Sequence, residues 1–155
     1  MSSNIYVEAQ MLIRKPVEDV FNAFINPEVT THFWFTKSTG KLEEGKTVIW
    51  EWEMYGVKSE VKVHQIIQNQ LIKTEWGEPS AKVDYEFTAM EKGTLVVIKS
   101  YGFSQTGEDL LKTVNDNTGG FTTVLDGCKA YLEHGIKLNL IEDKFPRNKS
   151  FPSMI

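Results

Sequence analysis

Three histidines and one cysteine are the side chains of this sequence best suited to metal binding or nucleophilic catalysis. His32, His64 and His134 lack the short ligand spacings of a zinc site, both among themselves and with Cys128. Cys128 falls on the apolar stripe of a predicted helix, where a thiol acts as a small buried hydrophobe. The sequence therefore predicts no metal, no cofactor and no catalytic residue. His32 stays a candidate because an aromatic run follows it directly, at the expected mouth of a cavity.

Acidic side chains recur along the predicted strands, but their alternation with apolar residues places them on the outer face of a sheet. They are Glu51, Glu53, Glu60, Asp84 and Glu86. The same alternation turns four neutral polar residues inward, namely Ser59, Gln65, Thr74 and Ser100. Such groups can hydrogen-bond a ligand, but they provide no base with a tunable pKa. An enzymatic role is therefore left open but not favoured.

Aromatic side chains form the most informative set. The two-residue period turns Trp50, Trp52, Trp76, Tyr85 and Phe87 inward, and Phe121 lies on the apolar stripe of the last helix. Rings of this kind either fill a core or line a ligand cavity. We take the ligand cavity as the hypothesis and place Trp34 near its entrance. The predicted ligand-binding residues are then Trp34, Trp50, Trp52, Ser59, Gln65, Thr74, Trp76, Tyr85, Phe87, Phe121 and Leu125.

Hydrophobic periodicity predicts the elements that position these residues. A strand over 5–13 precedes a short helix from residue 17 and a second from 27 to about 32. Period-two alternation then predicts strands over 48–54, 57–67, 72–76 and 83–89, and another within 94–103 that turns Val96, Ile98 and Ser100 inward. The remainder is typical of helix, with an interruption at 117–120 and one apolar stripe from Phe121 to Ile136.

The stripe of the last helix carries a prediction about stability. If Leu125 faces the sheet, Leu125→Ala should cost about 2–5 kcal/mol. Lys129 lies off the stripe, so Lys129→Ala should change stability by no more than about 0.5 kcal/mol.

Composition limits the class of protein. The 155 residues carry a formal net charge of −4, and no basic run with interleaved aromatics is present, so nucleic acid is not an expected partner. No apolar run is long enough to span a membrane, and the first residues lack the pattern of a signal peptide. We therefore expect one cytoplasmic α+β domain over residues 1–155, with a loosely packed tail from about residue 139.

Four segments, in this order and spacing, resemble the START-like (SRPBCC) superfamily, which has the helix-grip fold of the plant Bet v allergens. They are IRKPVEDVFNAFINPE, LEEGKTVIWEW, KGTLVVIKSYGF and GGFTTVLDGCKAYLEHG, within residues 13–138. Within the superfamily the chain is most similar to the family named for the activator of heat-shock protein 90 ATPase. The resemblance implies a curved antiparallel six-stranded sheet around a long C-terminal helix, with two short helices between strands 1 and 2.

Two departures from that family are visible. Gly120-Phe121 stands where the family often has Gly-Trp, which keeps an aromatic ring at the start of the helix. The eukaryotic activators also carry a separate N-terminal domain that engages the chaperone, and 155 residues leave no room for it.

Three functions remain open on these grounds. The favoured one is binding of a small hydrophobic or aromatic molecule between the sheet and the C-terminal helix. The alternatives are a chaperone-associated interaction module and a polyketide cyclase-like enzyme.

Overall fold

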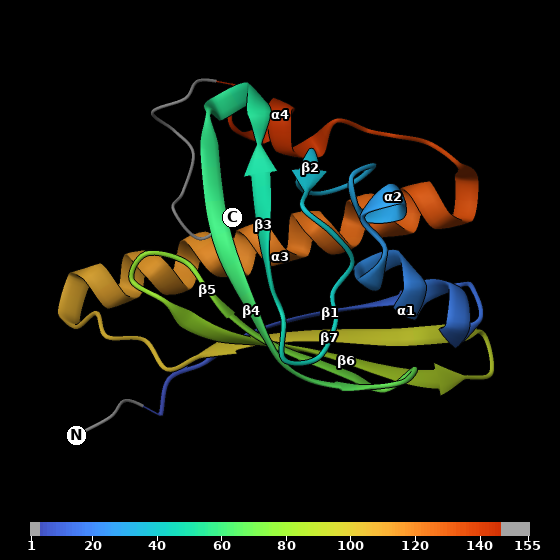
Figure 1. The fold of residues 1–155 in the computed structure, drawn as a ribbon, viewed down its shortest axis with the longest axis horizontal. Coiled ribbons are helices and arrows are strands. Elements are labelled where there is room, and N and C mark those ends of the chain that lie inside the picture. Colours follow the sequence, from blue (N-terminus) through green and yellow to red (C-terminus); the bar gives the residue numbers. More distant parts are fainter. Residues whose placement is uncertain (1–3, 147–155) are drawn as a thin grey trace.

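A seven-stranded antiparallel sheet and one long helix form the body of the molecule in a computed structural model that describes residues 4–146 (Figure 1). The strand order is β1-β7-β6-β5-β4-β3-β2, so β1 pairs with β7 and the other neighbours follow the chain. The strands are β1 (Val7–Ile13), β2 (Lys37–Ser38), β3 (Thr47–Trp52), β4 (Val57–Ile67), β5 (Leu71–Trp76), β6 (Ala81–Met90) and β7 (Gly93–Tyr101).

Helix α3 (Gly107–His134) lies along one face of this sheet (Figure 1). Helices α1 (Val17–Ile25) and α2 (Pro27–Thr30) lie beside its C-terminal half, and α4 (Leu140–Lys144) lies near the end of β3. A 3₁₀ turn, η1 (Glu53–Tyr55), joins β3 to β4. The face that alternation predicted to be apolar therefore packs on α3, as expected for a two-layer domain.

The two short helices begin and end where the sequence indicates. Pro16 precedes α1, and Asn26 ends it with extended backbone. The Asn26 side chain then accepts a hydrogen bond of 3.1 Å from the N–H of Glu28, which caps α2. Both helices lie between the first two strands, as predicted.

Two predicted features of the strands need correction. The sheet has seven strands, because the two-residue strand β2 pairs with β3 at Lys37–Glu51 and Ser38–Trp50. A strand this short carries no period-two signal. Met54 lies in the 3₁₀ turn, not at the end of the strand before it.

Helix α3 is continuous, so the interruption predicted at 117–120 is wrong. Asn117 and Gly120 are buried. Packing against the sheet outweighs the low helix propensity of asparagine and glycine there.

Residues 140–145, which follow α3 after an exposed stretch at 135–139, are packed rather than loose. Ile141 and Phe145 are buried in the core, and the Tyr55 hydroxyl donates hydrogen bonds to the carbonyl oxygens of both, at 3.2 and 2.6 Å. The predicted loose tail is therefore wrong for residues 140–145, and its remainder from residue 147 lies outside the described residues. Within residues 4–146, no helix has the length and apolar character to cross a membrane.

Candidate ligand-binding site

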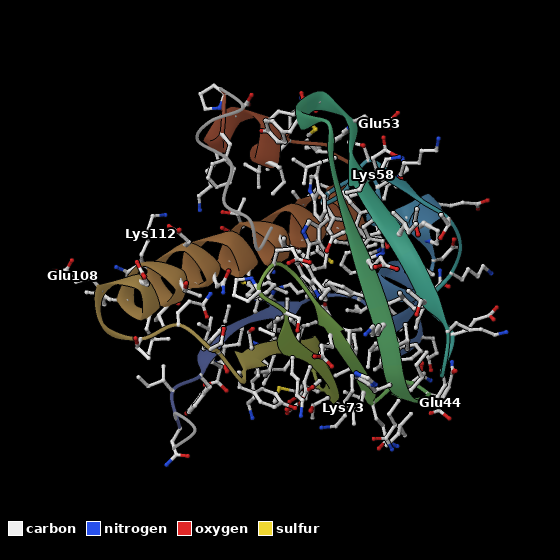
Figure 2. The ribbon with its side chains drawn as sticks, turned by 60° about the vertical axis from the view of Figure 1, so that its left-hand side comes forward. Glu44, Glu53, Lys58, Lys73, Glu108 and Lys112 are labelled. Carbon is white, nitrogen blue, oxygen red and sulfur yellow. The ribbon has the colours of Figure 1, made fainter. Side chains whose placement is uncertain are left out.

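A continuous cluster of aromatic rings fills the interior between the sheet and α3. Trp34 lies at its centre, with ring centroids 4.9 Å from Trp50, 5.9 Å from Trp76 and 6.2 Å from Tyr85. The Phe121 ring of α3 packs on the helix side of the cluster, and its centroid lies 6.3 Å from that of Trp34. These separations are those of rings in direct contact, with several edge-to-face pairs. Figure 2 shows side chains crowding the space between the sheet and the helix.

The position of Trp34 differs from the prediction. The sequence placed it near the entrance of a cavity, but its side chain is buried and touches rings from three strands and from α3. The backbone after α2 explains the difference, because the Trp34 N–H still donates to the carbonyl of Thr30 and so turns the chain inward. An aromatic run in a loop gives no sequence signal for that turn.

Nine of the eleven predicted residues are buried in this interior, and they include Trp52, Phe87 and Leu125. Ser59 is half-buried opposite Trp50. The prediction that Gln65 points inward is wrong, because the β4–β5 register shifts between Val63 and Gln65. This irregularity leaves Gln65 exposed and turns Ile66 toward the core instead.

Several buried polar atoms in the interior lack a hydrogen-bond partner among residues 4–146. They are the indole nitrogens of Trp34 and Trp76, the Tyr85 hydroxyl, the Ser100 hydroxyl, and both polar atoms of the Asn117 amide. Thr74 is different, because its hydroxyl donates to the Val83 carbonyl at 2.9 Å. Buried polar groups without partners are uncommon in folded proteins and cost free energy unless water or a ligand satisfies them.

The environment of Tyr85 keeps its phenol protonated. Burial raises the pKa of Tyr85 far above its ordinary value, while the nearby Thr74 hydroxyl and Trp76 indole act in the opposite direction. Neither neighbour reaches the geometry of a hydrogen bond to the phenol. Tyr85 therefore presents a neutral hydroxyl to the interior.

A small pocket leads from the surface toward Trp34. It lies between Phe33, Gly127 of α3 and the segment 137–142, and its volume is only about 20 Å³. A water molecule needs roughly 10–15 Å³ on this measure, so the pocket holds about one. His32 also lines it, stacked on Tyr131 with ring centroids 4.3 Å apart. A larger occupant would require side chains to move.

The sheet carries four of the five predicted acidic side chains, with Asp84 as the most buried of them, whereas Glu53 lies in the 3₁₀ turn η1. The Asp84 carboxylate accepts hydrogen bonds from Lys73 Nζ at 3.2 Å and from the Tyr101 hydroxyl at 3.0 Å. The hydrogen bond to Asp84 is the main reason that the pKa of Lys73 is raised.

The cysteine and the histidines form no reactive or metal-binding group among the described residues. Burial raises the pKa of the Cys128 thiol, so the thiol stays protonated. Among the described residues, no three His, Cys, Asp or Glu side chains gather as a metal site requires.

Sequence reasoning missed several residues of the interior. Phe35 stacks on Trp50 with centroids 4.4 Å apart, and Phe24 of α1 lies 5.8 Å from Tyr85. Asn117 was assigned to a break in the helix, although it lies one turn before Phe121 and hence on the same side. Extending the apolar stripe back by four residues would have found it.

Comparisons with known proteins agree with this architecture. Residues 14–133 match the model of the family described as activator of Hsp90 ATPase homolog 1-like protein. The crystal structure of protein SSP2350 from Staphylococcus saprophyticus has a TM-score of 0.78 and 30% identity, over 86% of this chain and 96% of that one. No curated protein matches the sequence.

Two more distant structures share the fold. The Aha1 dimer from Colwellia psychrerythraea has a TM-score of 0.71 and 16% identity, over 84% of this chain and 98% of that one. DynU16, from the dynemicin biosynthetic locus, has a TM-score of 0.78 and 15% identity over 87% of this chain. This chain spans 49% of that protein.

Proposed function

This chain belongs to the activator of Hsp90 ATPase homolog 1-like family, and we propose that it binds a small hydrophobic or aromatic molecule between its sheet and α3. The observation that carries the proposal is the ring cluster around Trp34, which presents indole and phenol groups that have no partner among the described residues. A core that needed only to be filled would gain nothing from such groups, because burying an unpaired N–H or O–H opposes folding.

The pocket beside Trp34 is the proposed access route. Gly127 forms part of its wall, and a Cβ there would lie 3.1 Å from Cβ of Phe33 and 3.6 Å from Leu140. The opposite wall is the segment 137–142, which includes the exposed Leu138. Displacing this segment would open a path to the ring cluster without breaking the sheet.

A ligand screen tests the proposal. The intact protein is titrated with fatty acids, flavonoids, sterols and polycyclic aromatics while tryptophan emission and the melting temperature are recorded. We expect at least one class to quench or shift the emission and to raise the melting temperature, because a ligand that binds only the folded state stabilises it. A Gly127→Leu variant should weaken that response by blocking the route, whereas Gly40→Ala, in open space on a loop, should not. If no compound moves either signal, the binding proposal fails.

Family membership favours a second candidate, assistance to a heat-shock protein 90 chaperone. The test is the ATPase rate of the chaperone from the same organism with increasing amounts of this protein. We expect little stimulation if ligand binding is the main role. A several-fold, saturable increase would make the chaperone role the better description.

A third candidate, a cyclase-like enzyme, would need an inward group that acts on its substrate. Thr74 is the polar side chain to test, since its hydroxyl lies buried beside the rings. If a turnover rate is measured for the wild type and is lost in Thr74→Val while ligand binding is retained, the enzymatic role would be favoured.

A further inference from the structure

The unpartnered polar groups come from both walls of the interior, the sheet and α3. Thr74, Val83 and Ser100 pair across β5, β6 and β7. Tyr85 follows Val83 by two residues on β6, and Trp76 follows Thr74 by two on β5, so each lies roughly 7 Å along the strand. Because β5 and β6 are antiparallel, Trp76 and Tyr85 lie on opposite sides of this row, one in each neighbouring row of the face that packs under α3.

Asn117 contributes its amide from the helix side. It precedes Phe121 by one turn, and the Phe121 ring lies 6.5 Å from Trp76 and 6.3 Å from Trp34. The Asn117 side chain is fully buried, and neither atom of its amide makes a hydrogen bond in the part of the chain that the structure describes. Sheet and helix thus both turn unsatisfied polar groups into the interior.

This set is rich in donors. The indoles of Trp34 and Trp76 can only donate, the hydroxyls of Tyr85 and Ser100 can each donate once, and the Asn117 amide can donate twice. Counted by atoms, five of them can donate, and three can accept, namely the two hydroxyl oxygens and the amide oxygen. A matching ligand must therefore supply acceptor atoms such as carbonyl, ether or phenolic oxygens.

The absence of buried charge from the described interior limits the class of ligand further. Among residues 4–146 the buried charged side chain is Asp84, which lies on the outer face with Lys73 and Tyr101. The interior thus offers no cation to an anionic ligand and no anion to a cationic one within the described chain. An ion placed there would lose its hydration without gaining a partner.

Resting on the ligand-binding role proposed above, we infer that these groups form a polar subsite within the interior, which selects a neutral aromatic molecule carrying hydrogen-bond acceptors. The rings hold the aromatic body, and Trp76, Tyr85, Ser100 and Asn117 hold its oxygen atoms. Selection then depends on uncharged donors rather than on an ion pair.

Three probes of nearly equal shape test the subsite, namely 2-acetylnaphthalene, 2-isopropylnaphthalene and 2-naphthoate. Dissociation constants are measured by isothermal titration calorimetry on the intact protein. We expect the ketone to bind about threefold or more tightly than the hydrocarbon, as one or two net hydrogen bonds imply, and at least about tenfold more tightly than the carboxylate.

Single substitutions test whether the named polar groups cause the preference for the ketone. Tyr85→Phe removes one hydroxyl and keeps the ring, so it should fold normally and reduce the ketone-to-hydrocarbon affinity ratio by about two- to tenfold. Ser100→Ala should act in the same direction. Tyr101→Phe is the matched control on the outer face and should leave the ratio unchanged.

The outcomes separate the two proposals. If none of the three probes binds, ligand binding itself is contradicted for molecules of this size. If the hydrocarbon binds as tightly as the ketone, or if the carboxylate binds best, ligand binding stands and the polar subsite is wrong. Equal loss of all three probes in Tyr85→Phe would also contradict the subsite, because it would indicate a packing effect.

Discussion

Leu125 is the residue that best measures how tightly α3 packs on the sheet. Its side chain is fully buried, while Leu111 on the same helix is 62% exposed. We expect Leu125→Ala to cost about 2–5 kcal/mol of unfolding free energy, because truncation leaves a cavity. The same substitution at Leu111 should change it by less than about 0.5 kcal/mol. Urea denaturation of both variants is the measurement, and equal losses would contradict the placement of the helix.

Lys129 makes contacts that the apolar stripe of α3 could not predict. Its position off the apolar stripe predicted a tolerant site, but its ammonium donates to the Leu12 carbonyl at 2.9 Å and to Glu133 at 2.6 Å. These bonds tie α3 to β1, across 117 residues of sequence. We now expect Lys129→Ala to cost about 1–2 kcal/mol. Lys112→Ala removes an exposed lysine that pairs with Asp116 within the same helix, and thermal unfolding should show a smaller loss.

At the scale of elements, Glu133 is the second half of the connection between α3 and β1. Burial alone would raise the pKa of its carboxyl, but the Arg14 N–H at 2.8 Å and the Lys129 ammonium outweigh burial and lower it below the ordinary 4.5. A carboxyl with a lowered folded-state pKa stabilises the fold above its unfolded pKa. That contribution is lost as the pH falls from about 4.5 through the folded-state pKa.

The Glu133→Gln variant tests this linkage. It should melt below the wild type at pH 7, and the difference should shrink as the pH falls below about 4.5. Glu60→Gln, at an exposed position on the outer face of β4, is the control and should show no such convergence. A constant difference in melting temperature across the pH range would contradict the role of the Glu133 charge.

The elements themselves were largely predictable, because period-two alternation and the helical stripe are strong signals over long segments. The inward register of Val96, Ile98 and Ser100 is confirmed by their burial. The irregularity at Val63–Gln65 was missed although the sequence marks it, because two polar residues in a row, His64 and Gln65, interrupt the alternation where the register shifts. Local patterns could not show that the 33–35 loop places Trp34 inside the ring cluster.

At the scale of the whole molecule, the ring cluster joins the sheet, the 33–35 loop and α3 into one core. Unfolding any one of these parts would expose rings of the others, so the domain should unfold cooperatively. We expect tryptophan emission and far-ultraviolet circular dichroism to give coincident urea transitions. Emission changing well before the backbone signal would indicate that the interior loosens while the sheet persists, and would contradict a single cooperative core.

The packing of the tryptophans also determines how the protein interacts with light. All four indoles of the chain belong to one contiguous group, since Trp50 lies 5.4 Å and Trp52 6.5 Å from Trp76, and Trp34 lies 4.9 Å from Trp50. At such separations the transition dipoles couple, and excitation passes between rings before emission. The polarisation of the emitted light should therefore be low although the rings are held rigidly. A single indole-to-phenyl substitution should change the spectrum of the whole group rather than subtract a quarter of it.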